Sequence, residues 1–268
     1  MPVVITQDLI INAQSGSVFP LNYARIGYQS YLEESMLSLS TGTIVSGYPL
    51  VNCLSSQTFE VAKVDGAAMQ IEIDLGQAQD VDYVALTSKN STVYTLLHSN
   101  DNVNYTSVVF SADSSKKAKM ALFDSVNARY WRLFIGSTSE TELTNLKLGI
   151  ALAMYRPIYG GHSPVTLNRA TVTSPNMSED GEFLGSTIKR KGFNGAYSYQ
   201  NLPAEWYRDF FDPFVEYART DAYYIAWNPL QFPLEVVYGW TTEDFAPSNM
   251  GVRDLMQVSW NLRGYDAS

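Results

Sequence analysis

The sequence predicts a mainly β protein, in which an antiparallel sandwich is followed by a second, β-rich α+β region with one helical segment. Residues 69–75 alternate strictly between apolar and polar side chains, the pattern of a half-buried strand. Other short apolar segments are separated by turn-forming residues, as in a sandwich. The aromatic content changes near residue 154: Trp206, Trp227, Trp240 and Trp260 follow this point, and only Trp131 precedes it.

The remaining strands of the first region can be placed in order. Residues 81–86 form a nearly continuous apolar run, which suits a central strand covered on both faces. Residues 92–98 and 106–110 flank the turn-forming residues 99–102, which predicts two strands joined by a turn. The last two strands are predicted from side chains in phase: Trp131, Leu133 and Ile135 in residues 129–135, and Leu146, Leu148 and Ile150 in residues 145–152.

The second region mixes strand and helix patterns. Residues 202–206 resemble a helix start, because proline is tolerated in a first turn. Pro213 interrupts the helical pattern, so we expect a kink there with Asp212 as cap and the helix ending near Arg219. Strands are predicted in the following segments: residues 165–172, 187–190, 222–227, 234–240 and 256–263.

The Pro- and Gly-rich residues 155–164 break any regular element and mark a boundary. The chain is therefore divided into an N-terminal leader or arm (residues 1–35), a sandwich (36–153) and an aromatic-rich α+β assembly region (154–268).

The net charge and the composition limit the kinds of partner and the compartment that we expect. The net charge of −9 at pH 7 disfavours nucleic acid and anionic bilayers, and the basic residues 189–191 are interpreted as a solvated face. A single cysteine excludes an internal disulfide. The N-terminal residues lack a secretory pattern, and no apolar run is long enough to span a bilayer. We therefore expect a protein that stays in the cytoplasm or is assembled into a particle there.

No catalytic constellation is found in the sequence. The only histidines, His98 and His162, lack metal-ligand spacing, and neither a phosphate-binding loop nor a nucleophile elbow occurs. Asp209, Asp212 and Glu216 share one helix face, which is typical of a solvated, salt-bridged surface rather than a cleft. We predict no enzyme activity, no metal and no cofactor.

Three motifs in the first region resemble discoidin-like domains, also called coagulation-factor type C or galactose-binding-like domains. They are IDLG at residues 73–76, SNDNVNY at 99–105 and ARYWRL at 128–133. The resemblance covers residues 36–152 and implies an eight-stranded jelly roll, whose relatives often bind sugars or lipids through loops at one end. The turn has Asn102 where the family has Gly and Tyr105 where it has Trp. Residues 54–59 replace the family's usual acidic turn, so the calcium ion of many members is not predicted.

Further segments resemble virion proteins of tailed bacteriophages, from the tail tip and baseplate: residues 24–31, 176–192, 202–206 and 227–240. This resemblance implies a non-enzymatic structural subunit in the virion tail, assembled in the host cytoplasm, whose partners are other tail proteins and copies of itself. The second region would make these contacts through aromatic side chains, which also suit a core: Trp206, Tyr207, Phe210, Phe211, Trp227 and Trp240.

The alternative function is a carbohydrate-binding module for host-surface glycans. Tyrosines in loops would stack on sugar rings and asparagines would bind hydroxyls. The candidate residues are Tyr28, Tyr48, Asn52, Asn90 and Asn127. A hydrolase is disfavoured, because the acid and base residues are missing.

Overall fold

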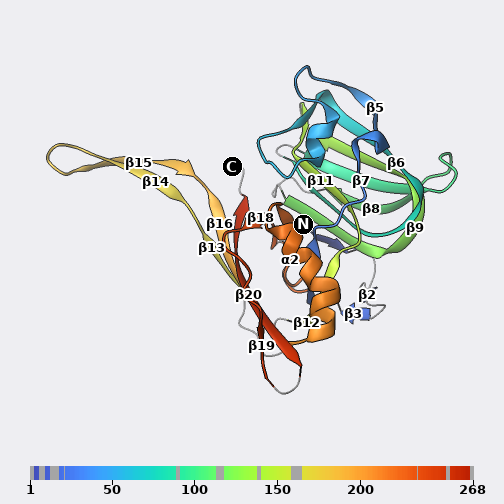
Figure 1. The fold of residues 1–268 in the computed structure, drawn as a ribbon. Coiled ribbons are helices and arrows are strands. Elements are labelled where there is room, and N and C mark those ends of the chain that lie inside the picture. Colours follow the sequence, from blue (N-terminus) through green and yellow to red (C-terminus); the bar gives the residue numbers. More distant parts are fainter. Residues whose placement is uncertain are drawn as a thin grey trace.

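A computed structural model describes residues 3–5, 10–12, 18–20, 22–88, 91–112, 118–137, 140–157, 165–233, 235–251 and 254–265. The predicted class is confirmed: a β-sandwich is joined to a second β-rich sheet that carries one helical segment (Figure 1). No helix in these ranges has the length and apolar character needed to cross a membrane.

The sandwich is built around two long strands that bend. Its elements are η1 (Glu34–Met36), β5 (Leu37–Ile44), η2 (Leu50–Leu54), β6 (Ala62–Thr87), β7 (Ser91–Ser99), β8 (Thr106–Ala112), β9 (Ala118–Ser137), β10 (Thr141–Leu143) and β11 (Asn145–Gly149). Both halves of β6 pair with β9, and the register shifts between Asp74 and Gln79, where Gly76 has a φ of 76°. We call this bend, together with the β7–β8 turn beside it, the corner of the sandwich.

The predicted alternation defines the sandwich core. Met69, Ile71, Ile73 and Leu75 are all buried, and they pack against apolar side chains from β9 and β11. The predicted strands at residues 81–86, 92–98, 106–110 and 129–135 all lie within observed strands. Short N-terminal strands accompany this part: β1 (Val3–Ile5) pairs with β9, and β2 (Ile10–Asn12) pairs with β3 (Val18–Pro20).

The second sheet draws on both ends of the described chain. Its strand order is β12 (Leu152–Pro157), β4 (Tyr23–Gly27), β17 (Tyr223–Ala226), β18 (Val236–Thr241), β20 (Leu255–Tyr265), β16 (Gly192–Pro203) and β13 (Thr166–Arg169), and β19 (Ser248–Asn249) pairs with β20. The strand β4 falls within the expected N-terminal arm, yet it is an interior strand of this sheet. The sheet therefore combines residues from before and after the sandwich.

The helical segment comprises α1 (Ala204–Trp206), a π turn at Tyr207–Phe211 and α2 (Asp212–Ala218). The expected cap at Asp212 is wrong, because helical backbone continues through Phe211 and no side-chain cap bond forms. Pro213 lies in the first turn of α2, where its missing N–H is tolerated. The ring of Phe214 packs edge-on against Tyr223, with centroids 4.8 Å apart.

Hydrogen bonds as well as apolar packing join the sandwich to the second sheet. The hydroxyls of Thr87 and Tyr224 lie 2.7 Å apart, and Tyr238 donates to the carbonyl of Ser56 at 2.8 Å. The ammonium of Lys147 donates to the Tyr217 hydroxyl at 2.6 Å. We call this contact region the joint between the two sheets.

Candidate functional site

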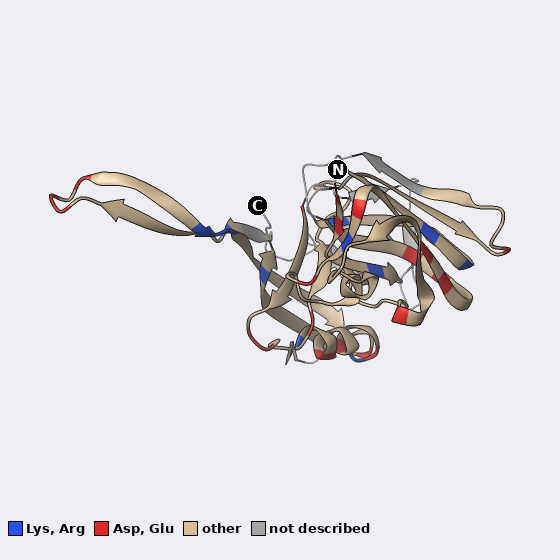
Figure 2. Ribbon diagram, turned by 90° about the horizontal axis from the view of Figure 1, so that it is seen from above, with Lys and Arg blue, Asp and Glu red and all other residues tan. Residues whose placement is uncertain are grey.

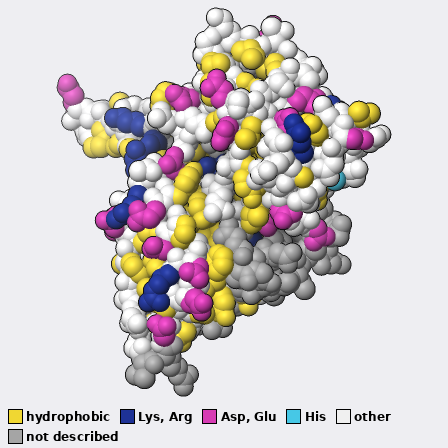
Figure 3. All heavy atoms as spheres, turned by 45° about the vertical axis from the view of Figure 1, so that its right-hand side comes forward, with side chains coloured by type: hydrophobic (Ala, Val, Ile, Leu, Met, Phe, Trp, Pro, Cys, Tyr) yellow, Lys and Arg dark blue, Asp and Glu magenta, His cyan; other side chains and the backbone are white. Residues whose placement is uncertain are grey.

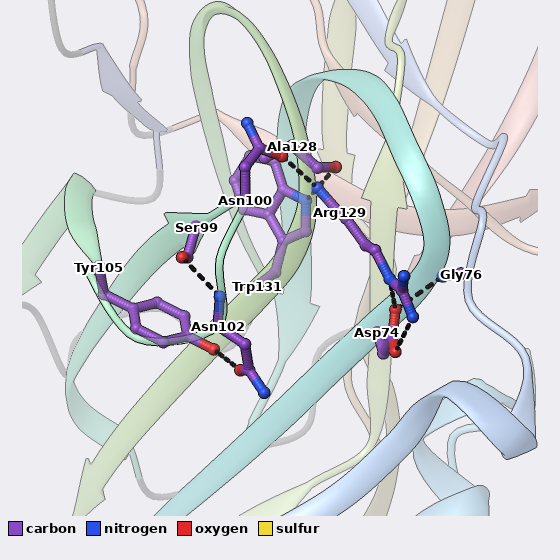
Figure 4. Close-up of polar contacts among 9 residues, drawn as sticks. All are labelled: Asp74, Gly76, Ser99, Asn100, Asn102, Tyr105, Ala128, Arg129 and Trp131. Carbon is purple, nitrogen blue, oxygen red and sulfur yellow. Dashed lines mark hydrogen bonds and ion pairs between the residues drawn. The ribbon is translucent and has the colours of Figure 1, made fainter.

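The three motifs that are separate in the sequence meet at the corner of the sandwich (Figure 4). Arg129 of β9 donates two hydrogen bonds to the Asp74 carboxylate, from Nε at 2.7 Å and from Nη2 at 2.8 Å. The Gly76 amide donates to the same carboxylate at 2.8 Å. The hydrogen bonds from Arg129 are the main reason that the pKa of Asp74 lies below its usual range. The pair therefore holds the bend of β6 against β9.

The turn between β7 and β8 is organised by one carboxylate. Asp101 accepts hydrogen bonds from the backbone amides of Asn104 and Val103 and from the Asn104 side chain, and these bonds hold its pKa well below the usual range. Asn102 has a φ of 59°, a left-handed conformation that asparagine tolerates better than most residues. An asparagine at this position is thus compatible with the turn.

A second ion pair supports an aromatic ring beside this turn. Arg132 donates to Glu72 at 2.7 Å, and its guanidinium lies 3.9 Å from the centroid of the Tyr105 ring. The Tyr105 hydroxyl donates to Asn102 Oδ1 at 2.6 Å. Burial would raise the pKa of Glu72, but the hydrogen bonds from Arg132 and Gln70 outweigh it and leave the pKa below its ordinary value. Glu72 is therefore an ionised acceptor at neutral pH.

These side chains border a hollow of about 190 Å³. Glu72, Asp74, Asn102, Tyr105 and Tyr130 line one part of it, and Ser35, Met36, Leu37 and Ser38 of η1 and β5 line another. Its volume is below the range of roughly 300–1,000 Å³ that is common for drug-sized ligands. Aromatic rings with acceptors and hydroxyls around so small a space suit one polar ring, such as a sugar residue.

The predicted sugar contacts are not brought together in one place. Tyr48 is 43% exposed, its ring lies 5.7 Å from the Lys63 ammonium, and Asn52 donates to the carbonyl of Val61 at 3.0 Å. This loop lies near the start of β6. Asn127 is exposed at the corner, where its carbonyl accepts a hydrogen bond from Asn100 and its amide donates to Asp80. Asn127 pairs with Asp80, after the bend of β6, whereas the Tyr48 loop lies beside Lys63 at the start of this strand.

The other two predicted sugar contacts are Tyr28 and Asn90. Tyr28 is predicted in a loop, but it is 4% exposed and packs against Phe214 with ring centroids 5.3 Å apart. It therefore belongs to the core of the second sheet, because it directly follows the interior strand β4. Asn90 lies outside the described residues.

Most of the predicted interface aromatics are core residues. Trp206, Tyr207, Phe211 and Trp227 are 5% exposed or less. The first three lie on the helical segment that packs on the second sheet, and Trp227 directly follows β17 of that sheet. Phe210 is partly buried against the same cluster. Trp240, at 38%, is the member of this set with an exposed ring. The core thus accounts for nearly all of these residues.

Sequence reasoning missed five polar and aromatic residues that line the hollow, although four of them lie in the quoted motifs: Glu72, Asp74, Asn102, Tyr105 and Tyr130. The motifs themselves could have indicated these residues, but they were used to predict the fold and not to predict which side chains share a surface. Within the described ranges, no group of three or more His, Cys, Asp or Glu could hold a metal ion. Cys53 is fully buried, and burial raises the pKa of its thiol to about 12.

Comparisons with known proteins give only distant likenesses. No family model matches the chain, and no curated protein matches it. Among solved structures, it is similar to chitosan-binding module 1 of a chitosanase/glucanase from Paenibacillus sp. IK-5, with 18% identity, a TM-score of 0.40, and coverage of 45% of this chain and 98% of the module. A carbohydrate-binding module of Clostridium perfringens in complex with GalNAc-β-1,3-galactose has 16% identity, a TM-score of 0.38, and coverage of 42% and 94%. A Ruminococcus gnavus fucosidase in complex with fucose has 14% identity, a TM-score of 0.42, and coverage of 47% and 27%.

Proposed function

We propose that the chain is a non-enzymatic carbohydrate-binding protein and that the hollow at the corner of its sandwich holds one sugar residue of a glycan. The observation that carries this proposal is the grouping of Tyr105, Tyr130 and Asn102 with the ionised carboxylates of Glu72 and Asp74 around that hollow. Carboxylate and amide oxygens accept hydrogen bonds from sugar hydroxyls, and a tyrosine ring packs against the apolar face of a sugar.

The affinity of such a small site is expected to be low. A hexose has about twelve non-hydrogen atoms, and about −0.3 kcal/mol for each gives roughly −4 kcal/mol. This free energy corresponds to a dissociation constant of about 1 mM. A broad glycan panel should therefore be followed by NMR titration, which detects binding this weak.

Two variants decide where the sugar binds. Asn102→Gly removes the amide acceptor without straining the turn, because glycine accepts the φ of 59°. Tyr48→Ala removes the exposed ring near the start of β6, away from the corner. Saturable binding that Asn102→Gly weakens at least tenfold and Tyr48→Ala leaves unchanged supports the corner hollow. The reverse result moves the site to the Tyr48 loop, and no binding across the panel removes the proposal.

A second candidate function is a structural subunit of a particle, namely a bacteriophage tail tip or baseplate. It is favoured by the hairpin of β14 (Val172–Met177) and β15 (Phe183–Arg190), which projects from the molecule (Figure 2). Its location in the virion tail and its tail-protein partners remain proposals. Mass spectrometry of purified particles tests them, and absence of the chain would exclude this function.

A further inference from the structure

A long hairpin stands apart from the two main sheets. β14 (Val172–Met177) and β15 (Phe183–Arg190) form a two-stranded sheet of their own that extends away from the body (Figures 1 and 2). The tip closes through a Ser178 to Glu182 turn, in which the Ser178 amide donates to the Glu182 carbonyl at 2.9 Å. An isolated hairpin of this kind is marginally stable in water.

The strand register divides the hairpin into two unlike faces. Met177 pairs with Phe183, Pro175 with Ser186 and Thr173 with Ile188, and residues directly opposite each other share a face. We call these six residues the apolar face of the hairpin. The other face carries mainly polar or small residues (Ser174, Asn176, Gly185 and Thr187), with Val172 at its root. Leu184, which is 65% exposed, lies at the register shift beside Met177.

The apolar face is open to solvent. Met177 is 63% exposed, Phe183 69% and Ile188 51%. Apolar side chains are visible along the projecting hairpin in the space-filling view (Figure 3). Three large apolar side chains on one face of a thin arm are typical of a surface that another protein covers.

The charges along the hairpin indicate which protein covers it. Acidic residues gather at the tip (Glu179, Asp180 and Glu182), and basic residues gather at the root (Lys189, Arg190 and Lys191). Figure 2 shows the tip red and the root blue. Two such hairpins side by side in the same direction would place like charges together. Two hairpins in opposite directions place each acidic tip on a basic root.

We propose that this hairpin docks on the same hairpin of a second copy of the chain, apolar face to apolar face and in opposite directions. The two copies are then related by a twofold axis, so that each residue makes the same contact twice. The charge order makes the hairpin complementary to itself in this arrangement alone. The mutual burial of Met177, Phe183 and Ile188 stabilises the pair, and the charges at tip and root select its direction.

The size of the contact sets the expected affinity. Eight residues at roughly 3.3 Å each, on strands about 4.8 Å apart, offer a few hundred square ångströms per copy. In total this is less than the roughly 1,200 Å² at which standard specific interfaces begin, so the dimer is a weak, transient one. We therefore expect a dissociation constant on the order of tens of micromolar, and weaker binding as salt screens the charges.

Sedimentation velocity of the full chain over about 1–100 μM at low salt tests the proposal. The parent is expected to shift from one chain to two within this range. Phe183→Ser should weaken the association at least tenfold. The control is Phe59→Ser, which removes an equally exposed ring (77%) on the sandwich and should leave the association unchanged. Thermal unfolding of each variant shows whether the fold is retained.

A charge exchange tests whether the charges at tip and root contribute to the association. Lys189→Glu with Lys191→Glu makes both ends acidic, and Glu179→Lys with Glu182→Lys makes both ends basic. Each double variant alone should remain monomeric, whereas an equimolar mixture should form a mixed dimer. A parent that stays monomeric throughout the range overturns the proposal. So does a dimer that Phe183→Ser does not weaken, or a mixture that does not associate.

Discussion

Replacement of Lys147 by methionine is expected to stabilise the protein at neutral pH. Lys147 is 5% exposed at the joint between the two sheets, and its ammonium donates to the Tyr217 hydroxyl. Burial lowers the pKa of this ammonium from 10.5 to about 8, although Asp221 partly opposes the effect. The folded protein therefore carries this charge at pH 7 at a cost, because water solvates it better than the joint does.

The cost follows from the difference between the folded and unfolded pKa. At 1.36 kcal/mol for each pKa unit, a fall from 10.5 to about 8 corresponds to about 3 kcal/mol at pH 7. Methionine has a similar length and no charge, but it gives up the bond from the charged ammonium to Tyr217, worth about 1.5–3 kcal/mol. The Tyr217 hydroxyl keeps the carbonyl of Ala222 as acceptor. The net expectation is a gain of about 1 kcal/mol in the free energy of unfolding.

The pH dependence distinguishes this explanation from better packing. Between about pH 8 and pH 10.5 the unfolded chain binds more protons at Lys147 than the folded chain does, so the parent gains stability as the pH rises. The advantage of Lys147→Met should therefore shrink by about 2 kcal/mol between pH 7 and pH 10. Urea unfolding followed by tryptophan fluorescence measures both values. Lys63→Met is the control, since the Lys63 side chain is 19% exposed and its ammonium pairs with Glu140 and with Glu142, the latter at 3.6 Å. A less stable Lys147→Met variant at pH 7, or the same gain at both pH values, would refute the reasoning.

Three further predictions concern stability. Burial raises the pKa of Asp82 to about 7, so between about pH 4 and pH 7 the folded chain binds one proton more at this residue than the unfolded chain does. The free energy of unfolding should therefore fall as the pH rises through that range. Asp82→Asn should remove most of this fall, as measured by urea unfolding at pH 5 and pH 8. Gly239→Ala would place a Cβ 2.4 Å from the carbonyl oxygen of Arg263, and should cost about 1–3 kcal/mol; an unchanged melting temperature would show that the backbone can move away. Trp206→Ala should cost about 3–5 kcal/mol as a core deletion, whereas Trp240→Ala should cost less than about 1 kcal/mol; equal losses in thermal unfolding would contradict their assignment to core and surface.

The sandwich could be predicted from the sequence because its buried residues alternate with more exposed ones along several of its strands. Ile71 and Ile73 alternate with Glu72 and Asp74, and the same alternation that indicates a strand also places both carboxylates on the outer face. The partners of these carboxylates are distant in sequence, since Arg129 and Arg132 reach them across the β6–β9 pairing. Alternation alone could therefore predict the faces but not the hollow that they border.

The strand β4 shows what a local pattern misses. Arg25 is fully buried between Ala24 and Ile26, so β4 has no polar and apolar alternation. It is a strand because β12 and β17 pair with it from far along the chain. Such pairing has no local signature, and for this reason Tyr28, which follows β4, was expected in a loop.

The proposed dimer and the proposed sugar site together predict stronger binding to a glycan-coated surface than to a free sugar. A single sugar site with a dissociation constant of about 1 mM contributes little by itself, but two sites held in one dimer can bind a glycan-coated surface together. Once one site is occupied, the gain from the second is about the ratio of its effective concentration to the dissociation constant, so an effective concentration of about 10 mM at a dense coating raises the avidity about tenfold over the single-site affinity. Phe183→Ser should therefore weaken binding to a densely coated surface about tenfold, while the dissociation constant for the free sugar in NMR titration stays the same. Surface plasmon resonance on a dense and a sparse glycan coating measures the first effect, and Phe59→Ser is again the control. Loss of the dimer without loss of surface binding would show that the hairpin has no part in glycan binding, and equal losses for free and surface-bound sugar would show that Phe183→Ser disturbs the sandwich itself.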